Sequence, residues 1–150
     1  MRFEVGFQGP TKSLAIKNNK KYMQLKPDII LYNSSIVHSI IDAKYKEVTT
    51  GEGNLQVIQV IQVIQVIQVI QTDIYQMLAY SVRYECNNIY LVYPKLIFDQ
   101  ESSLIVEELS IENYTNTVAI RIIKIDLEMQ PDELSNKLIE AINCNIQSEN

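Results

Sequence analysis

The sequence predicts a mixed α/β fold in one domain, with an antiparallel meander, a crossover helix, a parallel strand and a C-terminal helix. Three observations lead to this prediction. Short runs rich in β-branched residues, separated by polar turns, fill much of the first third of the 150 residues. A segment with apolar residues at helical spacing follows later, and another apolar strand comes directly after it. A proline and two acidic residues then mark the start of a last helix.

The chain is expected to open with short strands. Residues 3–8 form one strand, and residues 13–17 and 22–25 flank a polar Asn-Asn-Lys-Lys turn, which predicts a hairpin. The second hairpin strand is expected to continue through Pro27, because proline is tolerated at an edge or a bulge. Together with the next strand, this hairpin would form the antiparallel meander. Three lysines at the turn either contact a DNA backbone or keep the loop soluble: Lys17, Lys20 and Lys21.

A second hairpin is predicted from residues 26–31 and 40–46, which are rich in β-branched and aliphatic residues. The polar residues 33–35, Asn-Ser-Ser, are expected to form a three-residue turn. Such a turn pairs even-numbered with even-numbered positions and places Asp28 opposite Ile40. A two-residue turn would move Asp28 to the other face, because side chains alternate along each strand.

Three charged side chains then share one face of the second hairpin: Asp28, Asp42 and Lys44. Charges on apolar strands are costly unless they are paired or bind a cation. Two carboxylates on rigid strands suit Mg²⁺, which keeps several waters and binds phosphate oxygens, and a nearby lysine can orient or activate a metal-bound water. The alternative is an ordinary ion pair between Asp42 and Lys44 beside a turn aspartate.

A low-complexity segment at residues 55–71 separates the second hairpin from the predicted helix. It contains five copies of Val-Ile-Gln, from Val57 to Gln71. A period of three leaves neither a strand face nor a helix stripe purely apolar, and glutamine at every third position disfavours a membrane span. We interpret the repeat as an insertion without catalytic residues. It is either an N-terminal extension of the next helix or an extended, aggregation-prone segment.

The crossover helix is predicted over residues 74–85, with Thr72-Asp73 as its N-cap and Asn87-Asn88 at its end. Its core-facing stripe is expected to comprise five residues at helical spacing: Ile74, Met77, Leu78, Ser81 and Val82. The adjacent face, which can turn towards the charged hairpin, carries three polar residues: Gln76, Tyr80 and Arg83. An apolar strand follows at residues 89–93, and this order implies a right-handed crossover and a parallel strand pair.

The last third of the chain is expected to add one strand and one helix. Residues 95–117 look irregular apart from a short strand at 104–106. Residues 117–127 form a further strand, with Arg121 and Lys124 pointing outward. The final helix runs from Pro131 to about Asn145 and docks on the sheet through four apolar positions: Leu134, Leu138, Ala141 and Ile142.

Charge is distributed unevenly in this chain, whose net charge is −5. The first 46 residues hold eight Lys and Arg against three Asp and Glu, whereas the remainder holds five against fifteen. A cationic segment around an acidic metal site suits a phosphodiester substrate, and the alternative is a solvated face of lysines. The two cysteines, Cys86 and Cys144, lack the spacing of a zinc site or a disulfide framework, so we expect reduced thiols in a cytoplasmic protein. No secretory signal or membrane span is expected.

Four motifs occur in order within residues 1–130. They are Lys26-Pro-Asp-Ile-Ile-Leu31, Ile41-Asp-Ala-Lys-Tyr-Lys46, Asp73-Ile-Tyr-Gln-Met-Leu-Ala-Tyr80 and Ile89-Tyr-Leu-Val-Tyr-Pro94. This combination resembles the nuclease domain of McrC, the cleaving subunit of the 5-methylcytosine-specific restriction system McrBC, and the PD-(D/E)xK nuclease superfamily. The resemblance implies a restriction-endonuclease-like core and a single nuclease-like domain over residues 1–150. The domain would be truncated at its N-terminus, because the region before the nuclease domain and its opening helix are missing.

The resemblance also implies roles for the site residues. Two carboxylates and one carbonyl oxygen would bind Mg²⁺: Asp28, Asp42 and Ala43. Lys44 would position and deprotonate the attacking water. Gln76 and Tyr80 match the family's helix motif and would position the scissile strand or the lysine, the alternative being polar contacts at the edge of the core. His38 is interpreted as a rim residue, and the tyrosines at 75, 80, 84, 90 and 93 as packing residues that could otherwise stack on bases.

The implied activity is a Mg²⁺-dependent DNA endonuclease in cytoplasmic defence, acting on methylated DNA as part of a McrBC-type restriction system. The chain has no Gly-x-x-x-x-Gly-Lys-Ser/Thr motif, so GTP would bind to a McrB-like AAA+ GTPase partner. Two alternatives remain open. One is a catalytically impaired remnant that binds DNA or a partner, and the other is a stand-alone nuclease in repair or phage defence.

Overall fold

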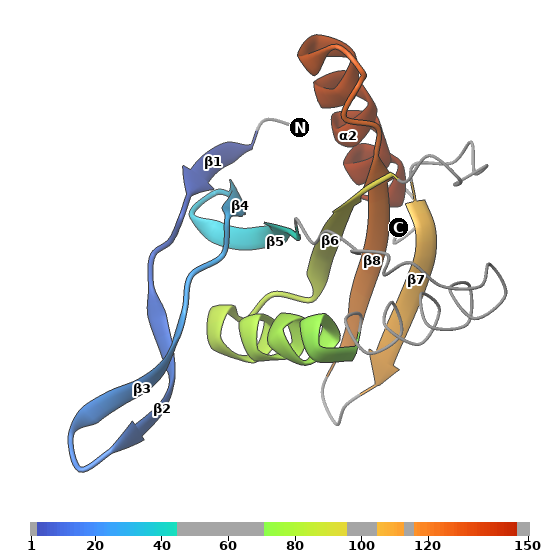
Figure 1. The fold of residues 1–150 in the computed structure, drawn as a ribbon. Helices are drawn as coiled ribbons and strands as arrows, with labels where there is room; N and C mark the ends of the chain where they lie inside the picture. The colour runs from blue at the N-terminus through green and yellow to red at the C-terminus, as the bar shows by residue number, and fades with distance from the viewer. Residues whose placement is uncertain (1–2, 45–70, 96–104, 113–115, 147–150) are drawn as a thin grey trace, which may run out of the picture.

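A six-stranded mixed sheet organises the protein (Figure 1). The computed structural model describes residues 3–44, 71–95, 105–112 and 116–146. The strands of this sheet are β1 (Glu4–Phe7), β4 (Ile29–Asn33), β5 (Ile36–Ala43), β6 (Asn88–Pro94), β7 (Ile105–Glu112) and β8 (Thr117–Ile125). Their order is β1-β4-β5-β6-β8-β7, with β5, β6 and β8 parallel and the other neighbours antiparallel. The mixed α/β class and the predicted parallel strand pair are therefore confirmed.

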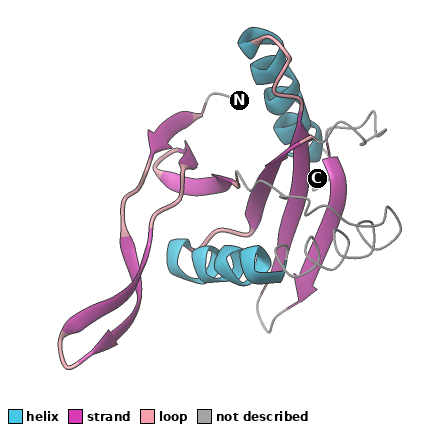
Figure 2. Cartoon of the chain, in the orientation of Figure 1, coloured by secondary structure: helices cyan, strands magenta, loops and turns pink. Residues whose placement is uncertain are grey.

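The first hairpin forms as predicted but does not join this sheet. β2 (Lys12–Lys17) and β3 (Lys20–Leu25) make a separate two-stranded ribbon that projects from the rest of the protein (Figures 1 and 2). The prediction that its second strand continues through Pro27 is wrong. Pro27 is fully buried and has no N–H for a strand ladder, and β1 lies beside β4 as the third antiparallel strand.

The turn between β4 and β5 is shorter than predicted. Asn33 pairs with Ile36, so the turn contains two residues, Ser34 and Ser35, instead of three. Both serines have positive φ, 50° and 69°, as a two-residue hairpin turn of this twist requires. Asparagine and glycine are the usual residues in such turns, and a serine pair therefore gave no signal for it.

A β-bulge compensates for the short turn. The register between β4 and β5 shifts by one residue, so that Ile30 lies opposite Ile40 and even-numbered positions again face even-numbered positions. If this register is continued, Asp28 lies opposite Asp42, whereas the predicted three-residue turn would place it opposite Ile40. Asp28 therefore lies on the predicted face because of a two-residue turn and a β-bulge, not because of a three-residue turn.

The crossover helix is described over residues 71–84. It already includes Thr72 and Asp73, so the predicted N-cap is wrong. Its C-terminus is a Schellman motif, because Glu85 has a φ of 54° and the amide of Cys86 donates to the carbonyl of Ser81 at 3.1 Å. The helix therefore ends slightly earlier than the asparagines predicted to stop it.

The buried face of this helix is rotated from the predicted stripe. Val82, predicted to lie in the core, is 70% exposed, whereas Met77 is fully buried as expected. Tyr80 and Tyr84 occupy the buried face instead. A tyrosine ring can fill core space while its hydroxyl reaches a polar partner, and both hydroxyls do so here.

Helices cover both faces of the sheet. The helix over residues 71–84 packs on one face through a core that includes Met77 and Ile89. α2 (Pro131–Ile146) packs on the other face, where Leu138 and Ile142 contact the second core, as predicted. β6 lies between the two cores, which explains its continuous apolar sequence.

The edge beyond β6 differs from the prediction in two ways. β7 is an eight-residue strand in a region predicted to be mostly irregular.

Arg121, predicted to point outward, is only 4% exposed. Its guanidinium contacts Glu108 at 2.7 Å and Asn88 at 3.2 Å, which satisfies the buried charge.

The Val-Ile-Gln repeat falls mostly outside the described residues. Its last residue, Gln71, belongs to the helix over residues 71–84. Within the described ranges, no helix is long and apolar enough to span a membrane.

Candidate active site

The two predicted carboxylates meet where β4 begins and β5 ends. Asp42 lies on β5, is 3% exposed, and faces the helix over residues 71–84. Asp28 immediately precedes β4, and its Oδ2 accepts a hydrogen bond from the backbone amide of Ala43 at 2.9 Å. This bond ties the start of β4 to the residue after Asp42, so both carboxylates lie at one end of the strand pair.

Lys44 directly contacts this site. Its Nζ lies 2.5 Å from Oδ2 of Asp42 and donates to Oε1 of Gln76 at 2.7 Å. Its backbone amide donates to the carbonyl of Val92 at 2.8 Å, which extends the β5–β6 pairing to this residue. The main chain of the lysine is therefore held by the sheet, and its ammonium is held by two side chains.

Gln76 and Tyr80 complete a closed ring of contacts with Lys44 and Asp42. Nε2 of Gln76 donates to the Tyr80 hydroxyl at 2.9 Å, and that hydroxyl donates to Oδ1 of Asp42 at 3.2 Å. The direction of donation is consistent around the ring, from lysine to amide, from amide to phenol, and from phenol to carboxylate. The structure thus brings together all five side chains proposed from the sequence.

Burial controls the protonation of Asp42 and Tyr80. Loss of solvation raises the pKa of Asp42, the neighbouring Lys44 ammonium opposes that rise, and the nearby negative charge of Asp28 adds to it. Burial also raises the pKa of Tyr80, and the charge of Asp42 raises it further. Tyr80 therefore stays protonated and acts as a hydrogen-bond donor to the carboxylate.

The donor set fits a magnesium ion. Oδ2 of Asp42 is buried and close to the Lys44 ammonium, but no described hydrogen-bond donor is aligned on it. Asp28 supplies a second carboxylate at the same end of the strands. Within the described ranges, no group of three or more His, Cys, Asp and Glu side chains could hold a metal. One or two carboxylates together with water and substrate phosphates is the usual environment of Mg²⁺.

The model of a family described as McrBC 5-methylcytosine restriction system component matches residues 1–94. The chain belongs to this family. The matched segment contains every side chain of the candidate site, from Asp28 to Tyr80, and ends with β6. Membership in the McrBC family makes the protein a restriction-system component, as the sequence motifs indicated. No curated protein matches the chain.

One polar pair near the site was not recognised in the sequence. Asp73, predicted to be part of the N-cap, is 3% exposed and accepts a hydrogen bond from the Tyr93 hydroxyl at 2.5 Å. Its position could have revealed this, because Asp73, Met77 and Tyr80 recur at i, i+4 and i+7 and therefore share a helix face. The pair links the helix that carries Gln76 and Tyr80 to β6.

The remaining candidates lie outside the ring. Nδ1 of His38 lies 2.7 Å from the Ser39 hydroxyl oxygen, and its ring packs against Phe3 with centroids 4.9 Å apart. Tyr84 and Tyr90 are buried, as packing residues are, whereas Tyr75 is 61% exposed, so the packing interpretation is wrong for Tyr75. Cys86 is a buried free thiol, and the side chain of Cys144 lies outside the described residues.

Proposed function

We propose that this McrBC-family protein is a Mg²⁺-dependent DNA endonuclease that hydrolyses phosphodiester bonds in methylated DNA together with a GTP-driven AAA+ partner. The observation that carries the proposal is the closed ring of Lys44, Gln76, Tyr80 and Asp42, with Asp28 joined to it through the Ala43 amide. An ordinary surface ion pair would not need two further buried or half-buried side chains to orient it.

The residues at the end of β5 would hold the metal. Asp28 and Asp42 offer carboxylate oxygens, with the Ala43 carbonyl as the third ligand. When bound, the ion supplies Lewis acidity and lowers the pKa of a bound water. The burial of Asp42 favours this role, because a cation offsets the cost of keeping its carboxylate ionised.

Lys44 would act on the attacking water and on the charge that develops at phosphorus. An ammonium beside the scissile phosphate holds a water in line and stabilises the negative charge of the pentacovalent transition state. Gln76 fixes the direction of the lysine by accepting one of its protons. The Tyr80 hydroxyl contacts both the side-chain amide of Gln76 and the carboxylate of Asp42. Residues on the helix therefore orient the site residues on the strand.

The partner would provide nucleotide binding. The sequence lacks the glycine-rich phosphate-binding motif, so GTP hydrolysis belongs to a McrB-like AAA+ subunit. We place this restriction system in the cytoplasm, where it would act in defence against modified DNA. The site on this chain would supply the cutting step, and the partner would supply movement along DNA.

The test combines the purified protein with methylated plasmid, Mg²⁺, GTP and the McrB-like partner. We expect nicking or double-strand cleavage that requires the metal and is lost in Asp42→Ala and Lys44→Ala. Asp132→Ala and Lys137→Ala are matched controls on the exposed surface of α2 and should retain cleavage. Cleavage that survives Asp42→Ala would contradict the assignment of the site.

Calorimetric titration with Mg²⁺ separates the roles of the two residues. Asp42→Ala should weaken metal binding, whereas Lys44→Ala should retain it and lose only the cleavage rate. A wild-type protein that binds Mg²⁺ and DNA but never cuts, with or without the partner, would support the non-catalytic remnant instead.

A further inference from the structure

The β2–β3 ribbon is strongly cationic. Residues 12–25 contain four lysines and no acidic residue, in a chain whose net charge is −5. Lys17 lies directly opposite Lys20 beside the turn, and Lys21 lies opposite Ile16 on the other face. Like charges placed opposite each other on a strand pair are destabilising, so packing within the ribbon does not account for them.

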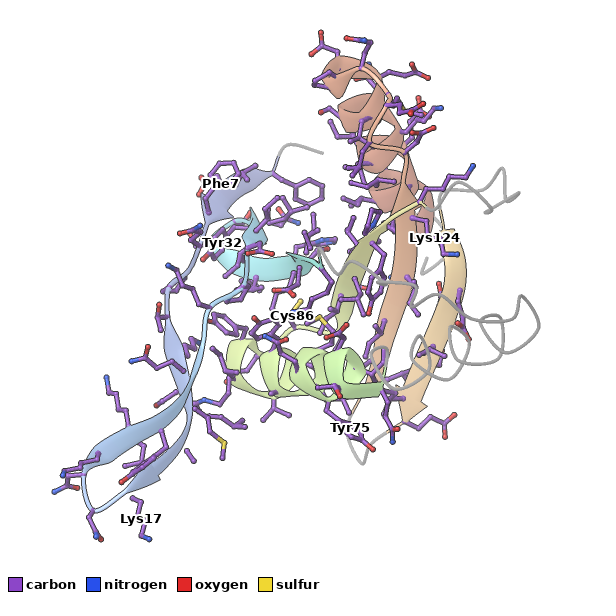
Figure 3. The ribbon with its side chains drawn as sticks, in the orientation of Figure 1. Phe7, Lys17, Tyr32, Tyr75, Cys86 and Lys124 are labelled. Carbon is purple, nitrogen blue, oxygen red and sulfur yellow. The ribbon has the colours of Figure 1, made fainter. Side chains whose placement is uncertain are left out.

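Among the described residues, no helix or strand covers the outer part of the ribbon. Ile16 is 66% exposed and Met23 is 67% exposed, and no described acidic side chain forms an ion pair with the tip lysines. Two-stranded ribbons with both faces in solvent bury little apolar surface. Figure 3 shows the Lys17 side chain at the tip, far from the sheet.

The base of the ribbon is anchored to the helix that carries the site residues. Nζ of Lys12 donates to the carbonyl of Arg83 at 2.9 Å and lies 4.8 Å from the centroid of the Tyr84 ring. The Tyr84 hydroxyl is within hydrogen-bond distance of the Pro10 and Leu25 carbonyl oxygens. These contacts hold both strands of the ribbon where they leave the domain and fix its direction relative to Gln76 and Tyr80.

The ribbon is also close to the site along the chain. Leu25, its last residue, is three residues before Asp28, a distance of at most about 11 Å. Strands of six residues add about 20 Å, so the tip lies within roughly 30 Å of Asp28. A duplex bound at the site would present phosphates over that length, at about 3.4 Å per base pair on each strand.

We propose that the β2–β3 ribbon is a DNA-binding arm whose tip lysines, Lys17, Lys20 and Lys21, contact backbone phosphates beside the cleavage site. The inference rests on the proposed function, because it takes DNA as the substrate of the Asp28 and Asp42 site. A two-stranded ribbon has the width to enter the major groove of DNA. Three cations without an acidic neighbour in the ribbon match phosphates better than they match the mixed charge of a protein surface.

The test measures binding of the full chain to a fluorescein-labelled DNA duplex by anisotropy, with EDTA present so that no cleavage occurs. Lys17→Gln combined with Lys20→Gln removes two charges from the tip. Lys124→Gln combined with Lys137→Gln removes two charges elsewhere, and Figure 3 shows Lys124 on the opposite side of the protein from Lys17. Affinities are compared over a series of NaCl concentrations, after circular dichroism has shown that all variants melt like the wild type.

We expect the tip variant to bind DNA roughly 10- to 100-fold more weakly and to lower the slope of log K against log salt by about 2, with the control near the wild type. If the tip and control variants lose equal DNA affinity, binding depends on the total charge of the protein rather than on the ribbon, and the proposal is overturned. Unchanged DNA binding, together with lost partner association in Ile16→Ser, would assign the ribbon to a protein interface and would also overturn it. If DNA binding depends on the tip lysines but the protein never cleaves DNA, the DNA-binding role of the ribbon is supported and the endonuclease function is contradicted. If the protein cleaves DNA and the tip variant binds DNA as the wild type does, the endonuclease function is supported and the role of the ribbon is contradicted.

Discussion

The hydroxyl of Tyr93 donates to Oδ2 of buried Asp73 at 2.5 Å and so joins β6 to the helix over residues 71–84. Burial raises the pKa of Tyr93, and the hydrogen bond and charge of Asp73 raise it further, so the phenol remains a donor. The same helix supplies Gln76 and Tyr80 to the ring around Lys44 and Asp42. The Asp73–Tyr93 bond therefore holds in place the element on which the candidate site depends.

Tyr93→Phe should lower the free energy of unfolding by about 1–3 kcal/mol, because it removes a charge-assisted hydrogen bond to a buried carboxylate. Urea unfolding followed by circular dichroism measures the change. Tyr75→Phe is the matched control on the neighbouring helix, where the ring is 61% exposed, and should change stability by less than about 0.5 kcal/mol. Equal effects of the two substitutions would show that the Asp73–Tyr93 bond contributes nothing.

Tyr80→Phe should slow cleavage about tenfold or more while leaving Mg²⁺ affinity close to that of the wild type. The ring is retained, but Gln76 loses the acceptor of its amide proton and Asp42 loses a donor, so Lys44 is less well oriented. Single-turnover cleavage rates and calorimetric titration give the two quantities separately. A variant that loses metal affinity and rate together would argue that Tyr80 supports the carboxylate rather than the lysine.

Asp42→Asn should stabilise the metal-free protein at neutral pH. The pKa of Asp42 is raised above its ordinary value of 3.8, mainly by burial, so the fold favours the protonated carboxyl. That favourable contribution is present below 3.8 and is lost as the pH rises through the higher pKa of the folded state. The isosteric amide keeps the neutral form at every pH, and its advantage over the wild type should therefore grow with pH.

Differential scanning calorimetry of both proteins in EDTA, from about pH 4 to about pH 7, measures this trend. Added Mg²⁺ should raise the melting temperature of the wild type and leave Asp42→Asn unchanged, because ligand binding to the folded state stabilises it. A variant that is less stable than the wild type at neutral pH, and equal to it at acid pH, would mean that the Lys44 ion pair outweighs burial.

The Cys86 thiol should react slowly with thiol reagents in the native protein. Its side chain is 1% exposed, and burial raises its pKa to about 11 from an ordinary value of 9.0. The reactive thiolate is therefore roughly a hundredfold scarcer than in an unfolded chain at the same mildly alkaline pH. Cys144→Ser leaves one thiol to follow with Ellman's reagent, with and without urea. Comparable native and unfolded rates would contradict the burial of Cys86.

The resemblance of four motifs to the McrC nuclease domain singled out the residues of the ring, and local periodicity predicted which of them share a face. Asp42 and Lys44 are two residues apart on a strand, and Gln76 and Tyr80 are four apart on a helix, so each pair must share a face. The parallel pairing of β5 with β6 also followed from the sequence, because a helix of that length returns the chain in the same direction. The shared faces follow from the period of a strand or a helix, and the parallel pairing follows from the length of the connection.

Asp28 shows where local pattern stops being sufficient. The short serine turn alone would have sent its side chain to the wrong face, and the β-bulge in the β4–β5 pair returns it. A bulge arises from the balance between twist, turn strain and packing on both faces of the sheet, and no residue in the segment specifies it. The position of Asp28 is thus a property of the assembled sheet.

Local sequence pattern predicts most of the helices and strands, the shared faces of Asp42 with Lys44 and of Gln76 with Tyr80, and the segregation of positive charge in the first 46 residues. Three features follow from the assembled fold instead: the cationic ribbon leaves the sheet, Arg121 is buried against Glu108, and Val82 faces solvent. Each of these features depends on which surfaces pack together. The free energy of folding depends on the total apolar area that is buried and on the pairing of buried charges, and these outweigh the conformational preference of a single segment.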